Sequence, residues 1–192
     1  KRVSPKIIKM QKKRLQKGFT LIELLVVISV IGMMASIVTT SVNGTRTKAR
    51  DAARKEAMRQ IQVALELYFE NNGSYPTTAG VWQSSSAGDN AAVVSAPGAY
   101  IPNLTPNYMA RLPADPRGGD SALCLGWKRA FLYRSNGADY KLLSHCATES
   151  GFNHADVFTD PARDGGANAC IVDGAATAGW AWTLYTPGAT CI

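Results

Sequence analysis

The chain has 192 residues, of which 46% are hydrophobic and 18% charged, and a formal net charge of +7, a length that allows one domain with a modest core. Eight of the 21 Lys and Arg residues lie in residues 1–18, where there is no Asp or Glu, so the remainder carries 13 basic and 14 acidic residues. The positive charge therefore gives little support to a nucleic-acid-binding protein.

Residues 19–42 form an apolar run in which Glu23 is the one charged residue. As a helix, this run would be about 36 Å long, which exceeds the roughly 30 Å hydrocarbon core of a bilayer. The sequence therefore predicts a membrane-spanning helix over residues 19–42, preceded by a basic leader over residues 1–18. The basic leader favours a cytoplasmic N-terminus, against a weaker opposing signal from the basic residues that follow the span.

The carboxylate of Glu23 requires a partner or a function. A charged side chain in a spanning helix costs on the order of 2.5 to 3.5 kcal/mol, and residues 19–42 contain no Lys or Arg to offset it. Cleavage after Gly18 would create an α-amino group on Phe19, one helical turn from Glu23. The same amino group on an axially shifted neighbouring copy would also reach Glu23, which would make the acid a device for assembly.

The basic leader, the segment Gly18-Phe19-Thr20-Leu21-Ile22-Glu23 and the apolar run together resemble the class III signal of type IV pilins and type II secretion pseudopilins. In that family a membrane peptidase cleaves after the glycine and N-methylates the new terminus, and the glutamate pairs with the amine of a neighbouring subunit. The resemblance implies cleavage between Gly18 and Phe19, N-methylation of Phe19 and a role of Glu23 in assembly. A plain membrane anchor or a secretory signal peptide would explain neither Glu23 nor the Gly18–Phe19 junction, and the apolar core of a signal peptide is shorter.

The same resemblance implies a location and partners. It implies a single-pass precursor in the bacterial inner membrane and, after cleavage, a helical filament in the cell envelope or outside the cell. The implied partners are the prepilin peptidase, an inner-membrane assembly platform, membrane lipid before assembly, and further copies of the chain. Met10 is a candidate start residue, because the leader from Met10 to Gly18 would have a length usual for the family.

Residues 43–72 are expected to continue as an amphipathic stem helix that ends at Asn72 before Gly73. The apolar residues recur at spacings of three and four, which marks one helical face. They are Ala49, Ala53, Ala57, Ile61, Ala64, Leu65 and Tyr68, and Met58, Val63, Leu67 and Phe69 widen the face.

Residues 73–121 are expected to be a connecting loop and residues 122–192 an antiparallel sheet with a disulfide-bearing C-terminal region. The Leu-Pro-x-Asp-Pro segment at residues 112–116 is similar to the one that introduces the pseudopilin sheet. Asn136-Gly137 is a hairpin signal. Strands are predicted at residues 122–127, 130–135, 139–144 and 179–186. The expected fold is α+β and pilin-like, with three or four antiparallel strands packed on the stem helix.

The four cysteines follow the predicted span, and an even number on the outer side favours disulfides over a zinc site. Three connectivities are possible. Pairing Cys170 with Cys191 is favoured because it would hold a Gly- and Ala-rich tail, and it leaves Cys124 to pair with Cys146. Each loop would contribute roughly 3 kcal/mol in the chain-entropy model.

No cofactor is required by the sequence, although Asp156, Asp160 and Asp164 recur at a spacing of four and could supply oxygen ligands to calcium. A solvated acidic loop is the simpler interpretation. The sequence contains no Gly-x-Ser-x-Gly, no phosphate-binding loop and no matched nucleophile, histidine and acid, so it does not indicate an enzyme.

The first hypothesis is therefore a structural filament subunit, with a type IV pilin and a type II secretion pseudopilin left open. The alternative is a minor pilin whose outer domain binds DNA or a surface ligand, although nucleic acid is not an expected partner. The residues considered for a DNA-binding patch are Arg111, Arg117, Lys128, Arg129 and Arg134. A third hypothesis is an anchored domain that does not assemble, in which Glu23 would be dispensable.

Overall fold

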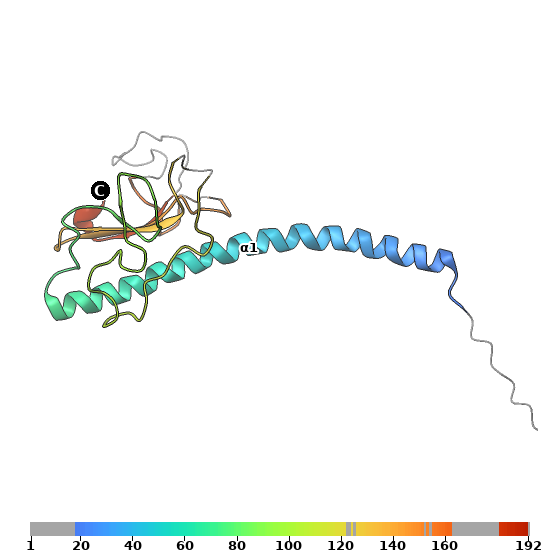
Figure 1. Ribbon diagram of the computed structural model, residues 1–192, viewed down its shortest axis with the longest axis horizontal. Coiled ribbons are helices and arrows are strands. Elements are labelled where there is room, and N and C mark those ends of the chain that lie inside the picture. Colours follow the sequence, from blue (N-terminus) through green and yellow to red (C-terminus); the bar gives the residue numbers. More distant parts are fainter. Residues whose placement is uncertain are drawn as a thin grey trace, which may run out of the picture. The chain divides into compact units, whose positions relative to one another are not determined.

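The computed structural model describes residues 18–121, 124, 126–151, 153, 155–162 and 181–191. The chain divides into two compact units, Lys1–Val42 and Asn43–Ile192. One helix, α1 (Leu21–Asn72), carries the chain from the first unit into the second without a break at Asn43-Gly44 (Figure 1).

In the first unit, the large apolar side chains that α1 carries are exposed from one end of the unit to the other. Among the described residues, α1 is the one helix long and apolar enough, by length and composition, to cross a membrane. Burying apolar surface contributes roughly 25 cal/mol per Å², and a continuous exposed apolar surface of this kind marks contact with lipid or protein.

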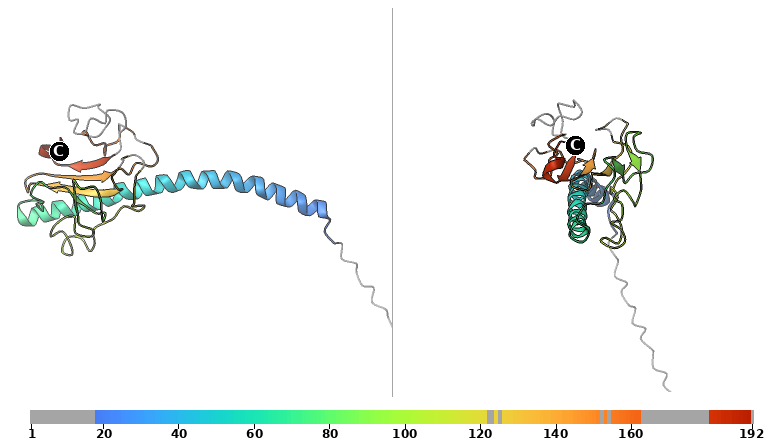
Figure 2. Two further views of the ribbon diagram at one scale, coloured as in Figure 1. Left: turned by 45° about the horizontal axis from the view of Figure 1, so that its top comes forward. Right: turned by 90° about the vertical axis from the view of Figure 1, so that its left-hand side faces the viewer.

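In the second unit, the stem part of α1, residues 43–72, lies along the sheet (Figure 2). Its apolar contribution to the core comes from the second half of the stem, where Met58, Ile61, Ala64 and Leu65 are buried. This confirms the predicted face for Ile61, Ala64 and Leu65, whereas Val63 and Leu67 are 69% and 53% exposed.

The first half of the stem differs from the prediction. Ala49 and Ala53 are exposed, and the buried positions are instead Asp51 and Arg54. Asp51, Arg54, Met58, Ile61 and Leu65 follow one another at spacings of three and four, so they form one continuous buried face. A search for apolar periodicity misses the charged half of this face.

The sheet has five strands in the order β2-β1-β3-β4-β5. The strands are β1 (Gln83–Ser84), β2 (Val94–Ser95), β3 (Ala130–Ser135), β4 (Tyr140–His145) and β5 (Trp182–Tyr185). β1 and β2 are parallel and the other neighbouring pairs are antiparallel, so the sheet is mixed rather than purely antiparallel. A short 3-10 helix, η1 (Pro187–Ala189), follows β5.

The predicted β3–β4 hairpin is confirmed, with β4 shifted by one residue, and β5 is shorter than predicted. The strand predicted at residues 122–127 is wrong for the residues described there, because Cys124, Gly126 and Trp127 lie in a turn. On either side of this turn, Asp120 and Lys128 form an isolated β-bridge. β1 and β2 lie in the segment expected to be a loop. Each has only two residues, too few for an alternating pattern, and β1 is defined by its pairing with β3.

The segment between the stem and β3 also fills the core, where Tyr100, Ile101, Leu104 and Leu112 are buried with the stem residues. The Tyr100 hydroxyl donates to the Pro113 carbonyl at 2.8 Å. This bond satisfies the phenol of Tyr100 inside the core. It also fixes the start of the Leu-Pro-x-Asp-Pro segment.

Candidate assembly site and charged cluster

The N-terminal end of α1 carries a reciprocal cap formed by Thr20 and Glu23. The backbone N–H and the hydroxyl of Thr20 donate to Oε2 of Glu23 at 2.8 and 2.7 Å, and the backbone N–H of Glu23 donates to the Thr20 hydroxyl oxygen at 3.3 Å. This is the capping box expected for Thr-x-x-Glu before an apolar run. The Thr-x-x-Glu spacing predicts this cap from the sequence. The Phe19 amine, considered alone as the partner of Glu23, is therefore not the one group that Glu23 can bind.

Glu23 also borders an apolar surface. It lies with Phe19, Ile22, Val26 and Val27 around an open hollow of about 330 Å³. The Phe19 side chain is 83% exposed. Oε2 of Glu23 is thus bonded to its own helix, while the described residues offer Oε1 no hydrogen-bond donor. A cation brought to this position could bind Oε1 without first breaking the cap.

The second unit contains a charged cluster that sequence analysis missed. It consists of Arg50, Asp51, Arg54, Asp115, Arg117 and Glu149. Arg54 is at its centre and is 0% exposed. Its partners Asp115 and Glu149 lie 61 and 95 residues away in the sequence. Such pairs cannot be identified from the spacing of residues within one helix or strand.

Arg54 binds all three carboxylates of the charged cluster. It donates from Nε and Nη2 to the two oxygens of Asp115 at 2.7 and 3.0 Å, from Nη1 to Asp51 at 2.8 Å and from Nη2 to Glu149 at 2.6 Å. The planar guanidinium matches a carboxylate in this paired geometry. Buried charges are tolerated when they are paired and hydrogen-bonded in this way.

Asp51 extends the charged cluster to the backbone that follows β4. Its carboxylate accepts the backbone N–H groups of Glu149 and Ser150, and also the Ser150 hydroxyl at 2.6 Å. The charged cluster therefore joins three distant segments, the stem, the Leu-Pro-x-Asp-Pro segment and the segment that follows β4. Its role is to hold the sheet on the stem.

The charged cluster lowers the pKa values of two of its acids. Hydrogen bonds from Arg50 lower the pKa of Glu149 to about 2, with a further contribution from Arg54 and against an opposing effect of burial. For Asp115, burial alone would raise the pKa, but the hydrogen bonds from Arg54 and from the backbone of Gly118 and Arg117 outweigh it and lower the pKa.

We expect the charged cluster to make stability depend on acid pH. A carboxyl group whose pKa is lower in the folded state is protonated first in the unfolded chain, so it stabilises the fold above its ordinary pKa and this contribution is lost as the pH falls. For Glu149 the loss should extend from about pH 4.5 down to about pH 2. Urea unfolding at several pH values should show that Glu149→Gln flattens this dependence. If the free energy of unfolding of Glu149→Gln depended on pH as steeply as that of the parent, the arginines would not lower the pKa of Glu149 in solution.

The predicted disulfide residues fall into two groups. Cys124 and Cys146 form a disulfide with a Cα–Cα distance of 5.8 Å, which ties the turn before β3 to the end of β4. Cys191 is also in a disulfide, whereas Cys170 lies outside the described residues, so its pairing with Cys191 stays a prediction.

The described candidates for calcium are each bound to a lysine. Asp160 forms an ion pair with Lys141 at 2.8 Å, and both side chains are 0% exposed. Asp156 pairs with Lys55 of the stem, and Asp164 lies outside the described residues. The described residues contain no group of three or more His, Cys, Asp or Glu side chains that could hold a metal ion, so calcium stays a prediction without a described ligand set.

The basic residues considered for DNA binding are largely engaged by their own chain. Lys128 donates to the Ala87 carbonyl at 2.7 Å, and Arg129 donates to the Asp120 carbonyl. Arg117 binds Glu149 at 3.1 Å, and the Arg134 guanidinium lies 5.8 Å from the centre of the Trp82 ring. These contacts use the cations to hold loops against the sheet.

Comparison with known proteins gives consistent matches. A family model described as the prokaryotic N-terminal methylation motif matches residues 13–39. The type II secretion system core protein G of Escherichia coli strain K12 is 37% identical over 113 residues, which cover 56% of this chain and 71% of that protein. The protein of the same name from Pseudomonas aeruginosa is 33% identical over 132 residues, covering 67% and 88%, and the one from Vibrio cholerae is 34% identical over 112 residues, covering 58% and 72%. No solved structure matches the chain.

Proposed function

The chain belongs to the family of the type II secretion system core protein G, and on this premise we propose that it is a pseudopilin precursor cleaved between Gly18 and Phe19. Members of this family are structural filament subunits rather than enzymes. The observation that carries the proposal is the methylation motif, whose match over residues 13–39 contains Gly18, Phe19 and Glu23 together.

In the precursor, the part of α1 that belongs to the first unit, residues 21–42, is inserted in the inner membrane with the basic leader in the cytoplasm. The exposed apolar side chains of the first unit support this, because lipid would cover them before assembly and neighbouring copies would cover them afterwards. The prepilin peptidase would remove residues 1–18 and methylate Phe19, and an inner-membrane assembly platform would then take up the mature chain.

Assembly would use Glu23 in two ways. Its bonds to Thr20 define where the helix begins, and its negative charge would attract the Phe19 amine of the next copy. A pairing between different surfaces of identical copies is heterologous, and such contacts generate a helical filament when the rotation does not close. The first unit would form the filament core, and the second unit would face outward.

The relatives favour a secretion pseudopilin over a surface pilus subunit, and they do not favour the alternative of a minor pilin that binds DNA or a surface ligand. The self-contained bonding of Lys128 and Arg129 also argues against a DNA-binding patch.

The cleavage site can be tested by mass spectrometry of the mature protein, which should begin at N-methylated Phe19. We expect Gly18→Val to leave uncleaved precursor in the membrane, because the peptidase must approach the backbone at this position closely. A Cβ at Gly18 meets no atom within 4 Å in the folded chain, and the same holds for Gly32. Gly32→Val is therefore the matched control and should be cleaved normally. A mature terminus elsewhere, or full cleavage of Gly18→Val, would contradict the proposal.

A further inference from the structure

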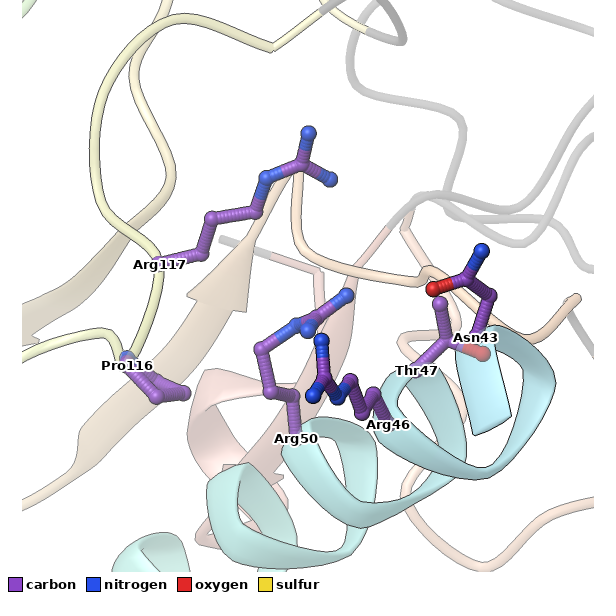
Figure 3. A pocket seen from close by; sticks show the side chains of 6 residues that line it. All are labelled: Asn43, Arg46, Thr47, Arg50, Pro116 and Arg117. Atoms are coloured by element: carbon purple, nitrogen blue, oxygen red, sulfur yellow. The ribbon is translucent and has the colours of Figure 1, made fainter. Parts of the chain in front are cut away.

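An open hollow of about 570 Å³ lies in the second unit beside the first turns of the stem (Figure 3). One wall is a single helical face made by Asn43, Arg46, Thr47 and Arg50, at spacings of three, one and three residues. The other wall is formed by Pro116 and Arg117. We call this feature the basic hollow.

The walls of the basic hollow are held in place by the charged cluster. Asp115, which precedes Pro116, is bound by the buried Arg54 of the stem. In Figure 3 the guanidinium groups of Arg46 and Arg50 lie next to each other, and the Arg117 side chain extends from the opposite wall. The cations are thus presented by two segments whose separation is set by buried bonds.

The basic hollow has an excess of positive charge. Arg50 and Arg117 both bind Glu149, and Glu149 also binds Arg54. Together with the buried Arg54, the three arginines that line the basic hollow make four guanidinium groups, and the charged cluster offers three carboxylates, those of Asp51, Asp115 and Glu149. For Arg46 the described part of the chain supplies no ion pair or side-chain hydrogen bond, and it is exposed. Its donors are available to an anion.

The position of the basic hollow along the chain indicates which anion. Asn43 directly follows the apolar segment 19–42, and Arg50 is seven residues further on. At 1.5 Å per residue, the helical wall lies within about 12 Å of helix from the end of that segment. The apolar segment is roughly 6 Å longer than the hydrocarbon core, and each headgroup layer adds about 5 to 8 Å. With the segment centred in the bilayer, Asn43 lies about 5 Å and Arg46 about 9 Å beyond the hydrocarbon core, and Arg50 lies about 15 Å beyond it. The Arg46 side chain leans back toward the N-terminal end of its helix, so its guanidinium reaches the phospholipid headgroups.

We propose that the basic hollow binds the phosphate of an anionic phospholipid headgroup while the precursor is in the membrane. Guanidinium groups bind phosphate oxygens through paired N–H donors, and the side-chain amide of Asn43 adds a neutral donor at one end. Basic residues beside an anionic leaflet contribute about 1 kcal/mol each. The bound headgroup would hold the sheet domain at the membrane surface until the subunit is extracted into the filament.

The inference rests on the membrane-inserted precursor of the proposed function but not on assembly, so the experiment measures lipid alone. The full-length chain in zwitterionic detergent would be titrated with phosphatidylglycerol, phosphatidylcholine and inorganic phosphate, and bound species would be counted by native mass spectrometry. We expect one phosphatidylglycerol to bind selectively over phosphatidylcholine. Inorganic phosphate should bind more weakly, because it lacks the acyl chains that reach the apolar segment.

The matched pair of variants is Arg46→Gln and Lys48→Gln. Each removes one positive charge from an exposed residue of the same helix, but Lys48 does not line the basic hollow. We expect Arg46→Gln to weaken phosphatidylglycerol binding about tenfold more than Lys48→Gln does, since a charge-assisted hydrogen bond contributes more than general attraction. Both variants should keep the urea midpoint of the parent.

Three results would overturn the inference. If the two variants weakened phosphatidylglycerol binding equally, the effect would come from the overall positive charge of the helix and not from the basic hollow. Inorganic phosphate binding as tightly as phosphatidylglycerol would assign the basic hollow to a soluble anion. Unchanged lipid binding in Arg46→Gln, together with a loss of filaments, would assign Arg46 to a carboxylate of a neighbouring subunit. None of these results would alter the N-terminus found by mass spectrometry, so the proposed function is tested separately.

Discussion

The Glu23→Gln protein is expected to be inserted and cleaved normally but to form no filaments. The amide keeps a side-chain oxygen that can accept the N–H and hydroxyl of Thr20, so the helix should still begin at Leu21. It has no charge with which to bind the Phe19 amine of a neighbouring copy. Breaking a buried ion pair by removing one partner costs about 3 to 5 kcal/mol, which corresponds to a loss of more than a hundredfold in affinity at each subunit contact. Immunoblotting and electron microscopy of sheared filaments would measure the effect.

The control for this prediction is Thr20→Ala, which removes the side chain of the cap but keeps the charge of Glu23. The loss of an N-cap costs about 1 kcal/mol, so this variant should assemble in reduced but measurable amounts. If Glu23→Gln assembled normally and Thr20→Ala did not, the role of Glu23 would be to start the helix rather than to bind a neighbour. Normal assembly of both variants would favour an anchored domain that does not need Glu23.

The Arg54→Met protein is expected to lose about 3 to 5 kcal/mol of its free energy of unfolding. Methionine fills a similar volume but leaves Asp51, Asp115 and Glu149 without their shared buried cation. The bond between Asp115 and the stem is lost at the same time, so the Leu-Pro-x-Asp-Pro segment should be held on α1 mainly by the core packing of Leu112. Urea unfolding of the full-length chain in detergent, followed by tryptophan fluorescence, would measure the change.

The control for Arg54→Met is Arg50→Met, which removes a partner of the same Glu149. The Arg50 side chain is 30% exposed and binds one carboxylate, which keeps its bond to Arg54 when Arg50 is replaced. We therefore expect a clear difference between two arginines four residues apart on one helix. Similar small losses for both variants would mean that water reaches the three acids once Arg54 is removed.

The charged cluster has a consequence for filament architecture. A helical filament needs every subunit to present its outer domain in the same orientation, so the sheet must not rotate on the stem. The buried bonds of Arg54 and Asp51 connect the stem to two segments of the sheet domain. Polar groups buried in this way restrict the number of possible packings as well as contributing energy, as some systems show.

The sequence by itself determined the features whose physics is local. Three features can be recognised without knowledge of the fold: the length of the apolar run, the single acid at Glu23 and the glycine before Phe19. Membrane insertion and the proposed cleavage both depend on one continuous segment of the chain. The Asn136-Gly137 turn and the strands beside it were predicted for the same reason, since a tight hairpin is specified by adjacent residues. The Thr20–Glu23 cap was equally local and could have been identified from its spacing.

Only the tertiary structure decided which face of the stem is buried and what holds the sheet against it. The alanine pattern indicated Ala49 and Ala53, but the buried positions are Asp51 and Arg54. The carboxylates of Asp115 and Glu149 bind Arg54, and the backbone N–H groups of residues 149 and 150 bind Asp51. A charged residue is normally placed on the surface by its cost of burial, and that expectation fails when a distant partner offsets the cost. The same long-range dependence explains β1, which is a strand because it pairs with β3, and β2, which pairs with β1. It also explains the basic hollow, whose two walls come from segments about 70 residues apart in the chain.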